Sequence, residues 1–416
     1  MRARPPPYLS LPDSAKVRFL MPPPDYDPLA PVNLRDPYPT YALMREHAPV
    51  LWHDRMQCWV VSRYADCVAV LRDHDTFARD PRRVGEALSE PSLSVQSLDP
   101  PELGPLRRLL MNAVHAHDLD GFAQRGRERA ADLLSVLAEK ETFDVVADFA
   151  SPFSLESVCD LLGVDRPEPG SFVAASDAIM RSMDAGLRPE TAEPGRLARH
   201  QLSALVASWF ADSGKPGLLA DMRRGAPTVG VPETYVRNTA RVLFQGGYST
   251  MVAAIGNVVA LLMERPGLLE RLGASEFRHC GIDEMIRYDG PVQGTSRTAT
   301  CAATIGSTRI AAGQTVLVLY AAANHDPEQF ARPDELLLDR SPNPHLGFGW
   351  GPHACAGTIL AQTVLHAVVD ALAEHPDRLC PSGSFARRRT ATMRGWERLP
   401  AAFAPVTRTT STEESP

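Results

Sequence analysis

The sequence lacks the features that would mark a secreted, membrane-anchored or nucleic-acid-binding protein. Its seven cysteines are odd in number and form no C-x-x-C pair, which argues against a disulfide framework and favours a reducing cytoplasm. The N-terminus is proline-rich and polar rather than an apolar signal core, so we expect neither secretion nor a membrane anchor. A net charge of −7 and no basic run longer than Arg387-Arg388-Arg389 argue against nucleic-acid binding.

What the sequence does contain is enough apolar material for a large core. Its 416 residues are 44% hydrophobic and 22% charged, which is typical of a globular protein. We expect an extended proline-rich segment over residues 1–35, a single folded domain over 36–406 and a mobile polar tail over 407–416. Such a protein is expected to be a monomer.

A long apolar segment, Val242 to Met263, carries no charged residue and is long enough to span a bilayer. Polar interruptions at Gln245, Ser249 and Asn257 favour instead a helix through the centre of a soluble protein. The pair Gly246-Gly247 predicts a local distortion of that helix.

Other stretches have weaker patterns. Pro81 to Pro101 reads as a long loop, and Thr298 to Tyr320 alternates as short strands do. Pro167 to Gly195 is predicted to be irregular, and its Met180 and Met183 are flexible side chains that suit a ligand-binding surface.

The most informative stretch is the glycine-rich loop Phe348-Gly349-Trp350-Gly351-Pro352-His353-Ala354-Cys355-Ala356-Gly357, which runs into an apolar segment. Its glycines allow positive φ and close approach of a flat, bulky group. Cys355 stands where a helix begins, and the positive end of a helix lowers the pKa of a thiol and favours the metal-binding thiolate.

Cys355 allows three interpretations. A lone cysteine is most often a small buried hydrophobic residue, but the clustered glycines and His353 argue against this here. A structural zinc site needs about four ligands, and only His345, His353 and Cys355 are nearby. A thiolate in a glycine-lined loop suits the axial ligand of a haem.

The loop resembles the haem-binding signature of the cytochrome P450 family, F-G-x-G-x-H-x-C-x-G, at every fixed position. The resemblance runs from about Asp36 to Pro400 and implies the family's mainly α fold with small β-sheets. It implies haem b held by Cys355, with Phe348, Gly349 and Gly357 beside it. The scarcity of lysine, found only at positions 16, 140 and 215, fits a soluble actinobacterial member.

The resemblance also assigns charged residues. Glu284 and Arg287 match the family's E-x-x-R and, with Arg340, are expected to form a structural network in which every buried charge is paired. Cationic partners for the haem propionates are Arg107, Arg297 and His353. Leu103 stands where the family usually has histidine, so one propionate contact is predicted to be lost.

The central helix departs from the family. The pattern A-G-x-[DE]-T, whose acid and alcohol help deliver protons during dioxygen activation, aligns with Gln245-Gly246-Gly247-Tyr248-Ser249, followed by Thr250. We name Ser249, Tyr248 and Thr250 as the candidate catalytic residues. Tyrosine, with a pKa near 10, is a poor proton shuttle at neutral pH, and Tyr248 as a packing residue is the alternative.

The resemblance further predicts a mostly apolar pocket for a hydrophobic small molecule. It is built from residues 81–97, 167–195, 244–249, 292–295 and 393–396. The named candidates are Phe244, Gly246, Val292, Gly294, Thr295, Met180, Met183 and Trp396.

The implied activity is a haem-thiolate monooxygenase of secondary metabolism, supplied with electrons from NAD(P)H by ferredoxin reductase and ferredoxin. Two alternatives stay open. One is an atypical haem-thiolate enzyme that performs cyclisation, coupling or rearrangement, or uses peroxide, because the acid–alcohol pair is replaced. The other is a haem-binding sensor without turnover.

Overall fold

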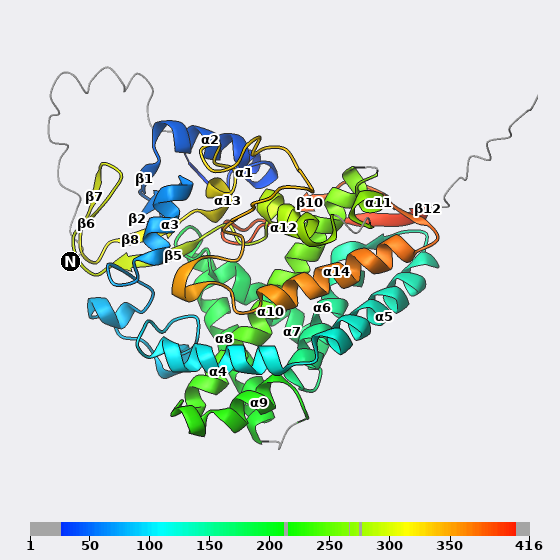
Figure 1. Ribbon diagram of the computed structural model, residues 1–416, viewed down its shortest axis with the longest axis horizontal. Coiled ribbons are helices and arrows are strands. Elements are labelled where there is room, and N and C mark those ends of the chain that lie inside the picture. The colour runs from blue at the N-terminus through cyan, green and yellow to red at the C-terminus, as the bar shows by residue number, and fades with distance from the viewer. Residues whose placement is uncertain (1–25, 212–214, 266, 274–276, 405–416) are drawn as a thin grey trace, which may run out of the picture.

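The computed structural model describes residues 26–211, 215–265, 267–273 and 277–404 and shows a mainly helical molecule with small sheets (Figure 1). Its α-helices are α1 (Pro31–Arg35), α2 (Tyr38–His47), α3 (Tyr64–Arg72), α4 (Leu103–Ala116), α5 (Leu119–Ala138), α6 (Ser151–Leu162), α7 (Pro169–Ser182), α8 (Ala192–Ala211), α9 (Leu218–Gly225), α10 (Glu233–Glu264), α11 (Leu268–Gly273), α12 (Arg278–Asp289), α13 (Tyr320–Ala323) and α14 (Thr358–Glu374). A π-helix at Val145–Ala150 leads into α6.

The strands form two groups: β1, β2, β5, β6, β7 and β8 lie at the left of Figure 1, and β10 and β12 lie toward the right. They are β1 (Val50–His53), β2 (Cys58–Val61), β3 (Phe77–Ala78), β4 (Phe143–Asp144), β5 (Thr295–Ala299), β6 (Ala303–Ile305), β7 (Thr308–Ile310), β8 (Thr315–Val318), β9 (Arg378–Pro381), β10 (Ala386–Arg387), β11 (Trp396–Arg398) and β12 (Pro400–Ala404). The largest sheet has the order β1-β2-β8-β5-β3, in which only β2 and β8 run parallel. Smaller sheets join β4-β12-β9, β10-β11 and β6-β7.

The centre of the helical part is α10, whose 32 residues are apolar around most of the helix. A helix of this kind must be buried on several faces. An apolar window of α10 is long enough to cross a membrane, but 72% of that window is buried inside the protein. The predicted central helix is therefore present and is covered by its own fold.

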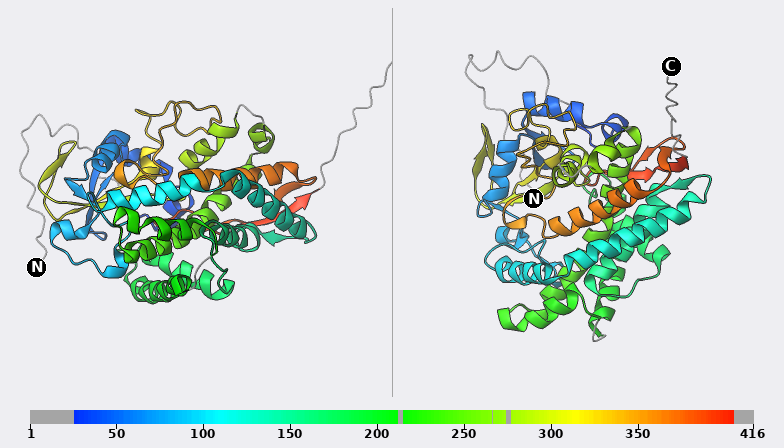
Figure 2. Two further views of the ribbon diagram at one scale, coloured as in Figure 1. Left: turned by 60° about the horizontal axis from the view of Figure 1, so that its bottom comes forward. Right: turned by 45° about the vertical axis from the view of Figure 1, so that its right-hand side comes forward.

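The helix α14, which follows the cysteine loop, runs side by side with α5 (Figure 2). The two helices approach closely because Gly126 of α5 has no side chain; a Cβ there would lie 3.3 Å from the Cβ of Ala367. Buried Leu365, Val368 and Leu372 recur at helical spacing along α14. This packing fixes the start of α14 and with it the position of the loop.

Three expectations about secondary structure are corrected. Pro169–Ser182 is the helix α7 rather than irregular, with Phe172 and Ile179 buried along one face. Ordered structure precedes Asp36, since α1 spans Pro31–Arg35 and Tyr26 is buried. The pair Gly246-Gly247 does not interrupt α10, which is continuous α-helix. The tail predicted over 407–416 lies outside the described residues, as does most of the segment 1–35.

Candidate active site

The cysteine loop is held in a fixed turn by its backbone. The Cys355 N–H donates to the Phe348 carbonyl over 2.7 Å, and the Gly349 N–H donates to the Leu346 carbonyl over 2.8 Å. Gly349 and Gly351 have φ of +71° and +73°. A Cβ on Gly351 would lie 2.5 Å from the Leu71 carbonyl oxygen, so the loop meets α3 only because this residue is glycine.

The sulfur of Cys355 faces a recess. The side chain is accessible, yet burial raises the pKa of the Cys355 thiol. A group that is both accessible and desolvated lies inside the fold against an open space. The Gly357 N–H points at the sulfur from 3.3 Å and opposes the rise. The expected lowering of the thiol pKa is therefore wrong for the free thiol, because burial outweighs the N–H groups at the start of the helix.

Buried cations lie beside the loop. Arg297 is 4% exposed, and burial together with the charge of Arg79 lowers the pKa of its guanidinium to about 10. Arg79 and Arg297 both donate from Nη1 to Thr295 Oγ1 and to the Ser296 carbonyl. Burial also lowers the pKa of Arg79. Two like charges, one half-buried and one buried, are thus held together, which is costly without an anion.

Asp99 is the carboxylate whose charge reaches both of these arginines. It is already engaged, because its Oδ1 lies 2.8 Å from His353 Nε2 and its Oδ2 accepts the backbone N–H groups of Arg79 and Asp80. The other ring nitrogen of His353, Nδ1, is buried and has no hydrogen-bond partner within the described structure. Burial lowers the pKa of His353. Because Nε2 faces the Asp99 carboxylate, Nδ1 of His353 can donate only when the imidazole is protonated. The arginines therefore supply the donors for an anion, and an anion bound here would favour protonation of His353.

Arg107 supplies a further cation. It lies on α4, and burial lowers the pKa of its guanidinium while the charge of Cys355 opposes that shift. Leu103, one turn earlier, is 2% exposed and packs in the main core. It offers no polar contact to the recess, in keeping with the predicted loss.

Arg79 is a site residue that the sequence analysis missed. It follows β3, whose pairing with β5 matches Phe77 to Ala299 and Ala78 to Thr298, so the register places Arg79 beside Arg297. One signal was available in the sequence: Arg79 directly follows a short apolar pair and begins a stretch rich in arginine.

These residues fit a haem. The Cys355 thiolate would bind the haem iron, and Arg79, Arg107 and Arg297 would meet the two propionates, with His353 joining them when it is protonated. Zinc does not fit, because no group of three or more His, Cys, Asp or Glu residues close enough to hold a metal ion occurs in the described part of the chain.

Glu284, Arg287 and Arg340 form the expected network. Both side chains of the Glu284–Arg287 pair are 0% exposed, and Arg287 donates from Nε over 2.8 Å and from Nη2 over 2.9 Å. Arg340 Nε lies 3.0 Å from Glu284 Oε2. Arg287 also donates to the carbonyls of Asn324, Pro333 and Glu335, which ties α12 to the segment before the cysteine loop. Every contact in this group is structural.

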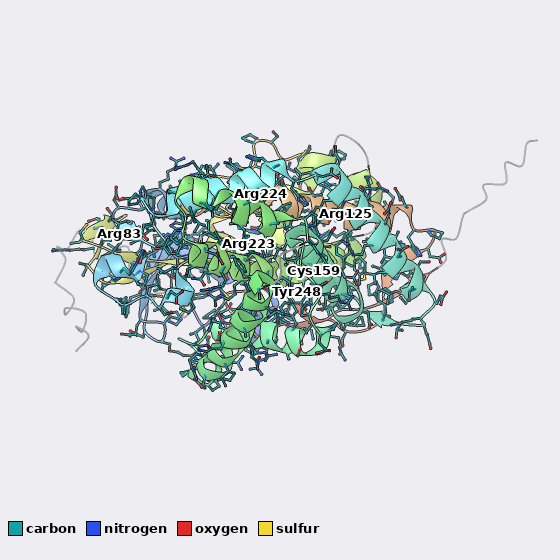
Figure 3. All side chains as sticks on the ribbon, turned by 90° about the horizontal axis from the view of Figure 1, so that it is seen from below. Arg83, Arg125, Cys159, Arg223, Arg224 and Tyr248 are labelled. Atoms are coloured by element: carbon teal, nitrogen blue, oxygen red, sulfur yellow. The ribbon has the colours of Figure 1, made fainter. Side chains whose placement is uncertain are left out.

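The three candidate catalytic residues face different ways. Ser249 Oγ donates to the Gln245 carbonyl over 2.8 Å, and Thr250 Oγ1 donates to the Gly246 carbonyl over 2.7 Å. Tyr248 is 4% exposed; its ring packs on Phe172 and its hydroxyl lies 2.8 Å from Ser151 Oγ (Figure 3). Burial raises the pKa of Tyr248, so it is a neutral packing residue facing α6 and α7.

Two of the predicted substrate residues border open or polar space. A Cβ at Gly246 would meet nothing within 4 Å, and Thr295 accepts from both Arg79 and Arg297. Val292 forms a β-bridge with Met393, which brings two of the predicted pocket segments together.

Other predicted substrate residues are core or surface residues in the structure. Phe244 is 0% exposed between Phe172 and Trp209, with ring centroids 4.8 Å from each. Met180 is buried as well. Met183 is 47% exposed, in the turn after α7.

Trp396 and Gly294 have structural roles. The Trp396 ring stacks against the guanidinium of Arg387, 3.5 Å from the ring centroid, and packs close to Gly256 of α10. Gly294 is needed for backbone packing, since a Cβ there would lie 2.5 Å from the Val318 carbonyl oxygen.

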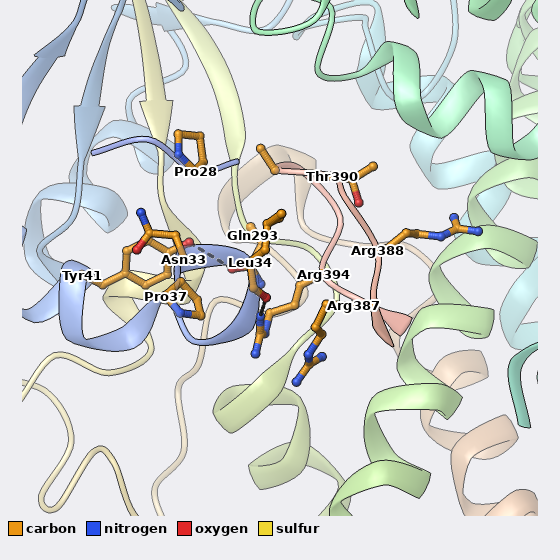
Figure 4. Close-up of a pocket in the computed structure, with 12 residues that line it drawn as sticks. Pro28, Asn33, Leu34, Pro37, Tyr41, Gln293, Arg387, Arg388, Thr390 and Arg394 are labelled. Atoms are coloured by element: carbon orange, nitrogen blue, oxygen red, sulfur yellow. Dashed lines mark hydrogen bonds between the residues drawn. The ribbon is translucent and has the colours of Figure 1, made fainter. Parts of the chain in front are cut away.

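A separate cleft lies between the N-terminal helices and the chain before β11 (Figure 4). Two of its arginines, Arg387 and Arg394, are paired with buried Asp289 at 3.0 and 2.6 Å. The cleft contains no residue of the cysteine loop, so it is not the candidate site.

Comparison with known proteins decides the family. A chain segment, residues 280–375, matches the model of the family described as Cytochrome P450. The sequence is 32% identical over 338 residues to mycinamicin IV hydroxylase/epoxidase of Micromonospora griseorubida, covering 76% of this chain and 81% of that protein. This chain belongs to the cytochrome P450 family.

Further relatives agree with this P450 assignment. Beta-dihydromenaquinone-9 omega-hydroxylase of Mycobacterium tuberculosis is 28% identical over 396 residues, which cover 92% of this chain and 79% of that protein. The crystal structure of CalO2 superimposes with a TM-score of 0.81 at 30% identity and covers 92% of this chain and 99% of that chain. The predicted fold and membership are confirmed, and the protein is a P450 monooxygenase with a haem-thiolate cofactor implied by its family.

Proposed function

We propose that this P450 oxidises a hydrophobic small molecule in secondary-metabolite biosynthesis, with Cys355 as the axial ligand of haem b. The observation that carries the proposal is the recessed sulfur of Cys355, accessible but desolvated, with the Gly357 N–H at 3.3 Å. An N–H directed at the sulfur would stabilise the thiolate of the holoenzyme. When bound, the haem supplies reductive activation of dioxygen.

The protein's own residues would orient the cofactor and the substrate. Arg79, Arg107, Arg297 and His353 would hold the propionates, and the open space beside Gly246 would receive the substrate. Relatives named for the oxidation of mycinamicin support a role in secondary metabolism. No flavin-binding or iron–sulfur segment was recognised in the sequence, so we infer electron supply by a separate ferredoxin and its NAD(P)H-dependent reductase.

The decisive experiment combines a spectrum with turnover. The reduced carbon monoxide complex should show the strongly red-shifted Soret band of thiolate ligation, and Cys355→Ser should lose it. The matched control is Cys301→Ser, since Cys301 is exposed outside the loop. With surrogate ferredoxin and reductase, substrate-dependent NAD(P)H consumption and an oxidised product are expected. The band without any turnover across a broad substrate panel would favour a haem sensor instead.

One observation favours the atypical enzyme as a second candidate. Tyr248 stands at the position of the family's acid. Its hydroxyl lies beside that of Ser151 and its ring packs on Phe172, so it provides no carboxylate to the site. A reaction that takes its protons from water or substrate, or that ends in cyclisation, coupling or rearrangement, is compatible with this arrangement. Product identification distinguishes it from simple hydroxylation.

A further inference from the structure

Arg241 of α10 is a partly buried guanidinium whose hydrogen-bonding groups are only partly used. Its Nη2 donates to the Pro91 carbonyl over 2.8 Å. Its Nε is buried and has no hydrogen-bond partner among the described residues. Leaving a buried N–H donor of a charged group without a partner is unfavourable, so Arg241 lowers the stability of the folded protein.

A second arginine stands on a helix that packs against α10. Arg199 of α8 donates from Nη2 to Ser182 Oγ over 2.7 Å. Burial lowers the pKa of both guanidinium groups, and the charge of Arg199 lowers that of Arg241 further. The two arginines therefore repel each other in a partly desolvated place.

Neither arginine has a carboxylate partner within the described structure, although their neighbours do. Arg237, one turn before Arg241, lies 3.3 Å from Glu90, and Arg196, one turn before Arg199, lies 2.5 Å from Glu193. The carboxylate of Glu90 is thus paired with Arg237, while the charge of Arg199 opposes that of Arg241. Two half-buried arginines without a carboxylate, beside two arginines that each have one, leave N–H donors available to an anion.

The position of the pair connects it with the active site. Arg241 precedes Gly246 by five residues, which is about 7.5 Å along a helix. Its carbonyl partner, Pro91, lies in the loop of residues 81–97, which also contacts α10 where the Val95 N–H donates to Thr239 Oγ1 over 3.1 Å. The pair is therefore set between this loop, α8 and α10, one helical turn and a half from the open space at Gly246.

We propose that Arg241 and Arg199 bind the carboxylate of the substrate, so that the natural substrate is a hydrophobic carboxylic acid. This inference rests on the proposed function and specifies its substrate class. The planar guanidinium presents parallel N–H donors that match the two oxygens of a carboxylate. With its acid group held there, the apolar remainder of the molecule would extend toward Gly246.

The test compares ligands that differ only in charge. Aliphatic and aromatic carboxylic acids, each paired with its methyl ester and its primary amide, are titrated into the holoenzyme and followed by the haem spectrum and by calorimetry. The acids should bind about tenfold more tightly than the matching esters. Arg241→Gln and Arg199→Gln should each remove this preference, while Arg237→Gln should keep it.

A second measurement needs no ligand. Since Arg241 is desolvated beside a like charge, Arg241→Gln should raise the midpoint of thermal unfolding of the ligand-free protein, and Arg237→Gln, which breaks an ion pair, should not. Equal stabilities, or a lower midpoint for Arg241→Gln, would show a structural role and overturn the proposal.

Failure of this inference is separable from failure of the proposed function. A holoenzyme that has the thiolate band and oxidises neutral compounds, yet binds acids no better than esters, overturns the anion site alone. Tighter binding of a matching alkyl phosphate than of the acid would overturn the assignment to a carboxylate. A protein without the thiolate band would contradict the proposed function itself.

Discussion

The hydroxyl of Tyr248 lies 2.8 Å from the hydroxyl of Ser151, and its ring meets Phe172 at a centroid distance of 4.8 Å. Tyr248 thus joins α10 to α6 and α7. In the sequence it stands at the position of the family's proton-relay acid, but its side chain is committed to packing. Family position and side-chain orientation therefore give different roles for this residue, and orientation is the more direct evidence.

We expect Tyr248→Phe to weaken folding without altering chemistry. Loss of one buried hydrogen bond should lower the free energy of unfolding by about 1 kcal/mol. Ser151→Ala should have a similar effect, and the double variant should be little worse than either, which a double-mutant cycle in urea would measure. Diversion of electrons from product to peroxide in Tyr248→Phe would contradict the packing role.

Arg287→Ala should abolish most soluble holoprotein. The Glu284–Arg287 pair is fully buried, and removing one partner of such a pair costs about 3 to 5 kcal/mol. The control is Arg196→Ala, which breaks an exposed pair of the same i, i+3 spacing and should cost less than about 1 kcal/mol. The yield of soluble protein and its haem content give the answer. A normal yield of Arg287→Ala with turnover selectively lost would assign the pair to chemistry.

Arg79→Ala should release haem faster. If Arg79 holds a propionate together with Arg297, its loss removes a charge-assisted contact and should accelerate haem transfer to apomyoglobin by about tenfold or more. The haem-free variant should be no less stable than the wild type, because the repulsion between Arg79 and Arg297 is removed. Arg82→Ala is a suitable control, since Arg82 is paired with Asp80 and Glu102. Unchanged haem transfer would show that Arg79 does not contact the cofactor.

Features that depend on local spacing were predictable from the sequence. The cysteine loop and the Glu284–Arg287 pair are contiguous motifs, and the central helix is one uninterrupted apolar segment. Arg79 was not predictable in this way, because its place beside Arg297 depends on the pairing of β3 with β5 across more than two hundred residues. The helix α7 was missed because small and polar residues, such as Gly170 and Ser176, weaken its apolar period.

Side-chain orientation on α10 is the other part that the sequence could not supply. Phe244 and Tyr248 lie one turn apart and both turn toward Phe172, a residue of a helix that had not been predicted. The face of a buried helix is set by its neighbours rather than by its own sequence, since α10 is apolar on most sides. The family resemblance assigns these residues to positions along the helix, but it could not say where their side chains point.

His325 should make stability depend on pH. It is 1% exposed between Tyr288 and Asp334, and burial lowers its pKa below the ordinary value. A histidine whose pKa is lower in the folded than in the unfolded state makes its full contribution to stability above the unfolded pKa of about 6.5. This contribution is lost as the pH falls through the pKa of the folded state. As the pH is lowered from about 8 to about 5.5, we expect the free energy of unfolding, measured in urea, to fall less for His325→Gln than for the wild type. Parallel pH profiles for the two proteins would show that His325 does not contribute.

Ser249 is the remaining hydroxyl at the family's alcohol position, and its replacement tests whether proton delivery passes through the chain. Its Oγ donates to the Gln245 carbonyl, which fixes the hydroxyl on α10 and leaves its lone pairs free to accept from water. Since Tyr248 points away, Ser249→Ala should slow product formation by roughly a hundredfold, the low end of what a positioned proton donor contributes, and should divert electrons to hydrogen peroxide. Ser249→Thr keeps the hydroxyl and should remain coupled. Thr363→Ala controls for the loss of a side-chain bond to a helix carbonyl, since Thr363 Oγ1 donates to the Ile359 carbonyl on α14 over 2.8 Å. If Ser249→Ala forms product at the wild-type rate while NAD(P)H use is unchanged, the protons come from water or from the substrate, and the atypical reaction becomes the better reading of this site.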